Sequence, residues 1–218
     1  MAIFQHDKSE IGSQPLTYTM QGRVANLHPN GNMTAAFAKA DVTLTLENGT
    51  TRQYQSERGI ISILDGVKVL PYGFWEGAWH VVMVEQFRVA LPGATLEPPG
   101  GGLDSADIRK KMTEELAEEA HILLEPQRIR MVYSAYVQPS VMAAKAHGGI
   151  VEIQHAELPE NLLAGEQHKG EYTVVCVRPL RELWTARGTG KWIPDLETWL
   201  LLDAVRYATD QQTEFGFR

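Results

Sequence analysis

Residues 96–122 read LEPPGGGLDSADIRKKMTEELAEEAHI, and this stretch decides the fold expected for the rest of the chain. Its Pro/Gly run cannot continue a helix or a central strand, so it predicts a loop. Asp104 or Ser105 is then placed to cap a helix, because a short oxygen side chain accepts hydrogen bonds from free backbone N–H groups. Asp107 in the first turn suits the positive end of the helix dipole. The stretch therefore predicts a loop followed by a capped helix.

The predicted helix carries a cluster of glutamates: Glu114, Glu115, Glu118 and Glu119. The last three stand at i, i+3 and i+4, so they share one helix face, where like charges cost stability unless a cation offsets them. A hard divalent ion such as Mg²⁺ or Mn²⁺ takes oxygen ligands and is one candidate cation. Lys110 and Lys111 leave a second interpretation open, in which i, i+4 ion pairs neutralise an ordinary solvated face.

The stretch resembles the Nudix box, whose family pattern is Gly, five residues, Glu, seven residues, then Arg-Glu-aliphatic-any-Glu-Glu-any-Gly-aliphatic. The run Glu115-Leu116-Ala117-Glu118-Glu119 matches the second half of that pattern. Ile122 matches its final aliphatic position. The glutamates that bind metal in the family are therefore present in this chain.

Three positions of the box depart from the family pattern. Counting back from Glu119 gives Gly100 as the first glycine and Ala106 where the family has Glu. If Gly101 is instead taken as the first glycine, Asp107 stands where the family has Glu. The helix is then one residue shorter than the family pattern requires. Glu114 stands at the position of the family's Arg, and His121 at that of its late Gly. A residue that ends a helix can adopt left-handed geometry at modest cost, so His121 needs no role as a ligand.

Composition restricts the classes of function that this chain can have. With 218 residues, the chain can form one large domain, or one domain with a smaller addition. The net charge of −7 and the pI of about 5.5 argue against a general nucleic-acid binder. A small anionic nucleotide is still allowed, because a bound metal would supply local positive charge.

The cellular compartment can be predicted from the number of cysteines and from the lack of targeting signals in this sequence. The only cysteine, Cys176, excludes an internal disulfide and fits a reducing compartment. It stands in an apolar run, which favours a buried structural thiol over a nucleophile. No stretch approaches the roughly 20 apolar residues of a membrane span, and the start of the chain lacks a secretion signal. We therefore expect a cytoplasmic protein without a membrane partner.

The first part of the chain is expected to form a small antiparallel sheet within residues 16–57. Residues 16–28 are moderately strand-like, and residues 29–33 are typical of a turn. Val42, Leu44 and Leu46 alternate with threonines, a period of two that predicts a half-buried strand. Asn48-Gly49 follows and predicts a hairpin with a return strand over residues 50–55. A sheet of so few strands is only marginally stable alone. This module must therefore pack against another surface.

The rest of the chain predicts strands on both sides of the acidic helix, followed by helices at the end. Strands are expected at 60–64, 67–70, 79–84, 129–137, 150–154 and 172–177. Loops are expected at 72–78, at 138–149 because of Gly148-Gly149, and at 155–170. A short helix is expected over 180–185. A longer one over 195–208 would be capped by Asp195.

This order of elements resembles the ADP-ribose pyrophosphatase branch of the Nudix superfamily over most of the chain. Residues 81–88 resemble the family strand that ends in Gln-aromatic-Arg, and residues 96–101 resemble its Glu-Leu-Pro-Ala-Gly lead-in to the box. Residues 170–175 resemble an acidic loop and strand of the family. The resemblance implies an α+β fold, with a Nudix α/β/α sandwich and mixed sheet over 58–218. It also implies an antiparallel β module over 1–57 that builds a homodimer.

The resemblance also implies roles for individual residues. Glu115, Glu118 and Glu119, with the carbonyl of Gly100, would bind Mg²⁺ or Mn²⁺, and Glu118 could instead position the attacking water. Glu171 would accept the proton of that water or hold a second metal; it could equally be a solvent-exposed carboxylate. The substrate-binding residues would be Gln86, Arg88 and Glu97, although the first two could be surface residues at a strand end. Arg88 could contact a substrate phosphate or Glu97, because Arg pairs with either oxyanion.

Two functions are consistent with this pattern. The first is metal-dependent hydrolysis of the pyrophosphate bond of ADP-ribose or a related nucleoside diphosphate sugar. The second is a Nudix-fold nucleotide-binding or regulatory protein whose turnover is impaired. The retained glutamates favour the first, and the departures at 106/107, 114 and 121 favour the second.

Overall fold

The structure is a computed structural model that divides the chain into two compact units. It describes residues 25–26, 33–45, 51–87, 94–137, 142, 144–159, 166–168, 171–186 and 195–214. The first unit comprises residues 1–63 and 137–144, and the second comprises residues 64–136 and 145–218. The boundary that the sequence predicts, after residue 57, lies inside a strand of the first unit that ends at Ile63.

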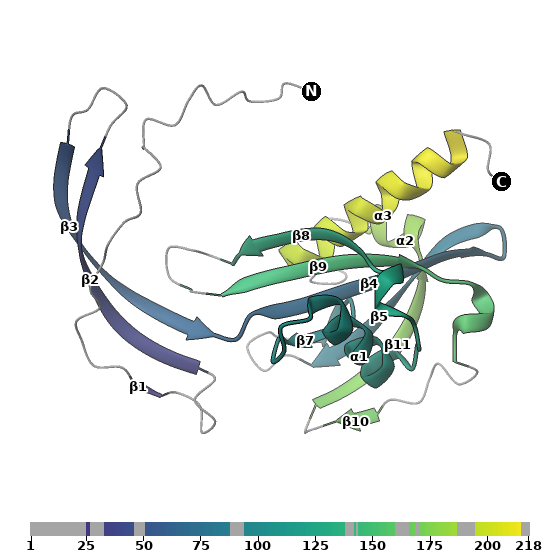
Figure 1. The fold of residues 1–218 in the computed structure, drawn as a ribbon. Helices are drawn as coiled ribbons and strands as arrows, with labels where there is room; N and C mark the ends of the chain where they lie inside the picture. Colours follow the sequence, from purple (N-terminus) through teal and green to yellow (C-terminus); the bar gives the residue numbers. More distant parts are fainter. Residues whose placement is uncertain are drawn as a thin grey trace. The chain divides into compact units, whose positions relative to one another are not determined.

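Among the described residues, the first unit is an antiparallel sheet in the order β1-β2-β3. Its strands are β1 (Ala25–Asn26), β2 (Met33–Thr45) and β3 (Thr51–Ile63). Figure 1 shows β2 and β3 running side by side, and their register extends from Thr45 opposite Thr51 to Met33 opposite Ile63. The predicted hairpin is therefore confirmed, with strands longer than expected. Asn48-Gly49 itself lies outside the described residues.

Eight strands of the described part of the second unit form one mixed sheet, in the order β10-β11-β5-β4-β9-β8. β6 pairs with β5, and β7 pairs with β4. The strands are β4 (Gly66–Trp75), β5 (Ala78–Phe87), β6 (Ala94–Glu97), β7 (Gly100–Gly102), β8 (Arg130–Tyr136), β9 (Lys145–Glu152), β10 (Glu166–His168) and β11 (Glu171–Pro179). β4 and β9 are parallel, whereas the other pairs are antiparallel. The expected mixed sheet of an α+β fold is thus confirmed.

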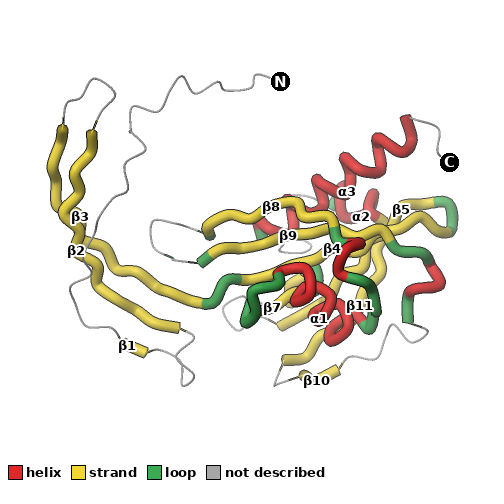
Figure 2. The backbone as a smooth tube through the Cα atoms, viewed as in Figure 1, coloured by secondary structure: helices red, strands yellow, loops and turns green. Residues whose placement is uncertain are grey.

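Helices cover both faces of this sheet, as Figure 2 shows. They are α1 (Ile108–Ala120), α2 (Leu180–Thr185) and α3 (Leu196–Glu214), with short 3-10 helices η1 (Pro126–Arg128) and η2 (His155–Glu157). Successive side chains of a strand point to opposite faces. Val67 and Val69 of β4 accordingly pack with α1, whereas Leu70 packs with α2 and α3. Within the described part of the chain, no helix is long and apolar enough to span a bilayer.

The elements near the end of the chain agree with the sequence predictions. α2 has the predicted bounds, and β8 and β11 lie where strands were expected. Asp195 caps α3 as predicted, because its Oδ1 accepts a hydrogen bond from the backbone N–H of Thr198 at 2.7 Å. α3 continues to Glu214, beyond the predicted end at residue 208.

The loop predicted over 72–78 is wrong, because β4 continues to Trp75 and β5 begins at Ala78. Only Glu76 and Gly77 form the turn, and both have positive φ angles, 53° and 77°. A two-residue hairpin turn with left-handed geometry at both positions matches the twist of the strands that it joins. The aromatic residues of this segment are therefore strand residues, and the ring of Phe74 contacts that of Trp79.

The loop predicted over 138–149 is also wrong at its end, because Gly148 and Gly149 lie inside β9. A Cβ atom on Gly148 would lie 2.2 Å from the ring of Tyr133, its partner on β8. A Cβ atom on Gly149 would lie 2.6 Å from a methyl carbon of Ile129. The two glycines are therefore strand residues that make room for neighbouring side chains.

Candidate active site

The acidic helix α1 begins later than its predicted caps. Asp107 is the N-cap, since its Oδ1 accepts a hydrogen bond from the backbone N–H of Lys110 at 3.1 Å. The prediction of Asp104 or Ser105 as the cap is wrong, because the carbonyl of Asp107 already accepts the first helical hydrogen bond, from Lys111. Asp107 thus precedes the first turn instead of lying inside it.

The end of α1 confirms the expectation for His121. This residue is the C-cap, with φ 55° and ψ 28°, in the left-handed region. The backbone N–H of Ile122 closes the end of the helix by donating to the carbonyl of Leu116 at 3.1 Å. His121 thus takes the backbone conformation that a glycine would adopt more easily at this position.

Two carboxylates of α1 lie against the glycine strand β7. The backbone N–H of Gly100 donates a hydrogen bond to Oε2 of Glu119 at 2.9 Å. A Cβ atom on Gly101 would lie 2.5 Å from Oε1 of Glu115, so this close approach requires a glycine. β7 is fixed from its other side by its pairing with β4. The structure therefore places Glu119 beside Gly100 and Glu115 beside Gly101.

The carboxylate of Glu115 is buried and is paired with a lysine of its own helix. Glu115 is 7% exposed and Lys111 is 8% exposed, and their charged atoms lie 2.9 Å apart. The same ammonium group lies 3.7 Å from Oδ1 of Asp104 in the preceding loop. Burial lowers the pKa of Lys111, but the hydrogen bond to Glu115 and the nearby carboxylates outweigh it and raise the pKa above its ordinary value.

Three further predicted site residues, Glu118, Glu171 and Gln86, belong to α1, β11 and β5. Glu118 is exposed on α1. Glu171 begins β11, opposite His168 of β10, and Gln86 lies in β5 opposite Thr173. The side chains of Glu171 and Gln86 lie outside the described residues, as does the whole of Arg88.

Glu97 belongs to a buried polar cluster on the α3 side of the sheet. It is 5% exposed and accepts hydrogen bonds from Nζ of Lys68 at 3.0 Å and from the hydroxyl of Thr95. The ammonium of Lys68 also pairs with Asp195 and lies 3.7 Å from a carboxylate oxygen of Glu197. A direct contact between Glu97 and a substrate would require Glu97 to leave these partners. Sequence reasoning missed this cluster, whose one signal was a lysine inside the apolar run at 67–70.

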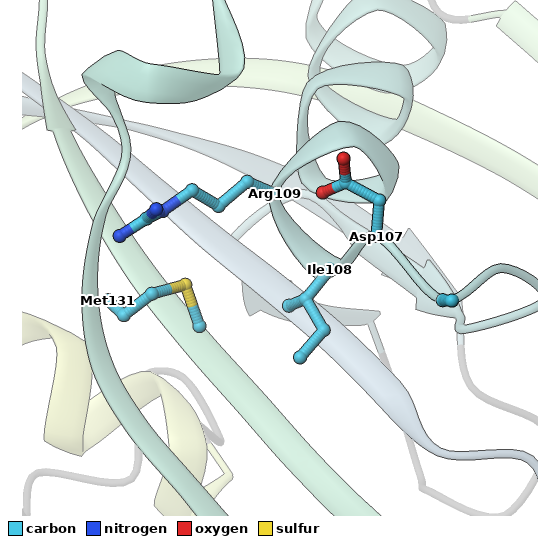
Figure 3. A pocket seen from close by; sticks show the side chains of 5 residues that line it. Asp107, Ile108, Arg109 and Met131 are labelled. Carbon is cyan, nitrogen blue, oxygen red and sulfur yellow. The ribbon is translucent and has the colours of Figure 1, made fainter.

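A pocket of about 590 Å³ lies at the start of α1. Its lining residues are Ala106, Asp107, Ile108, Arg109 and Met131. Figure 3 shows Ile108 and Arg109 extending from the start of the helix toward Met131 of β8. Glu119 belongs to the last turn of the same helix, so this pocket is separate from the contact between the carboxylates and the glycine strand.

Cys176 of β11 is partly buried, and its thiol lies 3.7 Å from the carbonyl oxygen of Val174. Burial raises the pKa of this thiol. Because the thiolate is the nucleophilic form, a raised pKa makes the residue less reactive.

No known protein-family model matches the chain, and no curated protein matches its sequence.

The donor atoms fit a hard divalent cation in kind, since carboxylate and carbonyl oxygens are its preferred ligands. The carboxylate of Glu115 lies against the backbone of Gly101, in the space that a Cβ atom there would take. Within the described residues, however, no three His, Cys, Asp or Glu side chains gather closely enough to hold a metal ion. The ammonium group of Lys111 is the cation in contact with Glu115 in this structure.

Proposed function

We propose that this chain is a Nudix hydrolase that cleaves the pyrophosphate bond of ADP-ribose or a related nucleoside diphosphate sugar, with Mg²⁺ or Mn²⁺ as its metal. One observation carries the proposal. Glu115 and Glu119 of α1 both meet the glycine strand that precedes the helix, at Gly100 and Gly101. The resemblance of residues 100–122 to the Nudix box implies that Glu115, Glu119 and Gly100 belong to one site, and this contact between strand and helix supports it.

In this proposal Glu115, Glu119 and the carbonyl of Gly100 would hold the ion, with Glu118 as a further ligand or as the residue that positions the attacking water. When bound, the ion supplies positive charge that offsets the negative charge of the two phosphoryl groups. Glu171 accepts a proton from the water, and such help is worth about 10²–10⁴-fold in rate. The water oxygen joins one phosphorus, and the bridging oxygen leaves with the other phosphate.

The substrate side of the proposal rests on Gln86 of β5 and on Arg88, two residues later in the sequence. An arginine guanidinium binds phosphate oxygens through two parallel hydrogen bonds, so Arg88 is suited to hold one phosphoryl group. Glu97 of β6 enters the proposal through its hydrogen bond to Lys68 of β4. We also propose that the protein acts in the cytoplasm as a homodimer built by its N-terminal sheet.

A second candidate function is nucleotide binding or regulation by a Nudix-fold protein with impaired turnover. The pairing of Lys111 with Glu115 favours it, because a carboxylate that is neutralised by its own helix is less available to a metal. Glu114, at the position of the family's Arg, adds a further negative charge beside the same residues.

A substrate panel separates the two candidates. The full-length protein is incubated with Mg²⁺ and a series of nucleoside diphosphate sugars, and the monophosphate products are detected by release of inorganic phosphate with an added phosphatase. We expect Mg²⁺-dependent hydrolysis of ADP-ribose, and we expect Glu119→Gln to reduce it strongly because the ion loses a carboxylate ligand. Glu114→Gln is the matched control, because this partly exposed residue of the same helix pairs only loosely with Lys110, at 3.7 Å. Binding of ADP-ribose without Mg²⁺-dependent products would favour the second candidate.

A further inference from the structure

Lys111 stands out among the cations of α1 because its charged group is buried. The helix carries two consecutive i, i+4 pairs, Lys110 with Glu114 and Lys111 with Glu115. In the first pair the charged atoms are 3.7 Å apart and the side chains are 65% and 42% exposed. In the second they are 2.9 Å apart and the side chains are 10% and 9% exposed. Only the second pair contains a predicted metal ligand.

The carboxylate of Glu115 is confined on two sides. The backbone of Gly101 lies so close that a Cβ atom there would be 2.5 Å from Oε1 and 2.8 Å from Oε2. The ammonium of Lys111 lies 2.9 Å from Oε1. A divalent ion that used Glu115 would therefore meet a positive charge at the oxygen it needs, and like charges repel strongly where water is excluded.

We propose that Lys111 is a built-in cation of the carboxylate site, which a divalent metal must displace from Glu115 in order to bind. This inference rests on the proposed function, since it assumes that Glu115 is a metal ligand. It identifies Lys111 as the residue of this chain that sets the metal affinity of the site.

The structure also offers the displaced ammonium another partner. Asp104, in the loop before α1, already lies 3.7 Å from Nζ of Lys111, and its side chain is 67% exposed. A small movement of a flexible four-carbon side chain would transfer the ammonium from Glu115 to Asp104. Lys111 then remains paired in both states, and Glu115 is paired with either the lysine or the metal.

The test measures binding of Mn²⁺ alone to the full-length protein, without nucleotide, from the electron paramagnetic resonance signal of free Mn²⁺. We expect Lys111→Met to bind Mn²⁺ at least about tenfold more tightly than the wild type, equivalent to about 1.4 kcal/mol. Lys110→Met is the matched control and should change the Kd by less than about twofold, because an exposed charge is screened. Lys111→Arg keeps the positive charge and should stay close to the wild type.

Thermal unfolding gives a second readout that does not depend on activity. Without metal, Lys111→Met should melt below the wild type, because it leaves a buried carboxylate without its cation. Added Mn²⁺ should raise the Tm of this variant more than that of the wild type. If Lys111→Met does not fold, Lys111→Gln keeps a hydrogen-bond donor beside Glu115 and should also bind Mn²⁺ more tightly.

Other outcomes would overturn the inference in distinguishable ways. An unchanged Kd in Lys111→Met, with binding still lost in Glu119→Gln, would make Lys111 a structural partner only and would leave the proposed function standing. An equal gain in Lys110→Met would mean that net charge alone sets the affinity. Absence of Mn²⁺ binding in the wild type and in every lysine variant would contradict the inference and the metal site together.

Discussion

Gly101 is the residue at which the strand before α1 comes closest to a carboxylate of the helix. A side chain there would overlap with Glu115, whereas the neighbouring Gly102 has room for one, since its nearest atom would be Leu64 Cδ1 at 3.6 Å. The two glycines lie in the same short strand and differ mainly in what faces them. This difference makes them a matched pair for testing the contact.

Gly101→Ala should lower the free energy of unfolding by about 1–3 kcal/mol, because the added methyl group must push away a buried carboxylate or the strand itself. Gly102→Ala should change it by less than about 1 kcal/mol. Urea unfolding of both variants measures the difference. Equal losses in the two would show that the Gly101–Glu115 contact is not as close as described.

Glu197 predicts a pH effect at the scale of one side chain. Burial raises the pKa of this carboxyl, although the nearby Lys68 lowers it. Below the ordinary value of 4.5 both folded and unfolded states are protonated. Above pH 4.5 the carboxyl of Glu197 ionises more readily in the unfolded state than in the folded state. The free energy of unfolding therefore decreases as pH rises toward the raised pKa. Glu197→Gln should therefore melt above the wild type at neutral pH, and the gain should disappear as pH falls to about 4.5. A variant that melts lower at neutral pH would mean that attraction to Lys68 dominates.

At the scale of elements, the correctly predicted segments are mostly those that depend on a short, continuous sequence pattern. The 180–185 helix, the Asp195 cap and the β2–β3 hairpin follow from caps, turns and periodicity that neighbouring residues supply. The Gly148-Gly149 error has the opposite origin. Glycines usually mark loops, but here the ring of Tyr133 on the next strand needs the space. This contact with the paired strand overrides a local preference, so the sequence alone could not reveal it.

The candidate site shows the same division. The glutamate spacing on α1 was predicted, because it belongs to one continuous stretch. The loop predicted for the glycines before it is wrong at Gly100–Gly102, which form β7 because they pair with β4. The burial of Lys111 and the Lys68–Glu97 pair were not predicted, since each depends on how elements pack. The cap was misplaced for a related reason, because three oxygen-bearing residues within four positions could each have begun the helix.

The ion pair between Arg128 and Glu157 joins η1 to η2. Its hydrogen bond, with a further one from the backbone of Gln154, lowers the pKa of Glu157 below its ordinary value of 4.5. A lowered folded-state pKa adds stability that is present above 4.5 and is lost as pH falls through the lowered value. Glu157→Gln should therefore cost roughly 0.2–1 kcal/mol at neutral pH. Unfolding curves of the two proteins should converge in acid. A gap that persists at low pH would show that packing, not charge, links the two short helices.

At the scale of the whole molecule, the first unit carries the prediction about assembly. Its described strands form a sheet of their own, and a sheet of so few strands is marginally stable without a partner surface. Light scattering of the full-length protein at micromolar concentration should give twice the chain mass of 24.3 kDa. A mass of one chain under those conditions would contradict the proposed homodimer.

The central claim is that the carboxylates of α1 serve metal-dependent cleavage of a pyrophosphate bond. Phosphorus NMR of ADP-ribose mixed with the protein and Mg²⁺ tests it most directly, because diphosphate and monophosphate resonances are distinct. The account predicts that the diphosphate signals are replaced by two monophosphate signals, and that this requires Mg²⁺ and is abolished by Glu119→Gln. Diphosphate signals that persist with the wild-type protein and saturating Mg²⁺, or that disappear equally fast with Glu119→Gln, would contradict it.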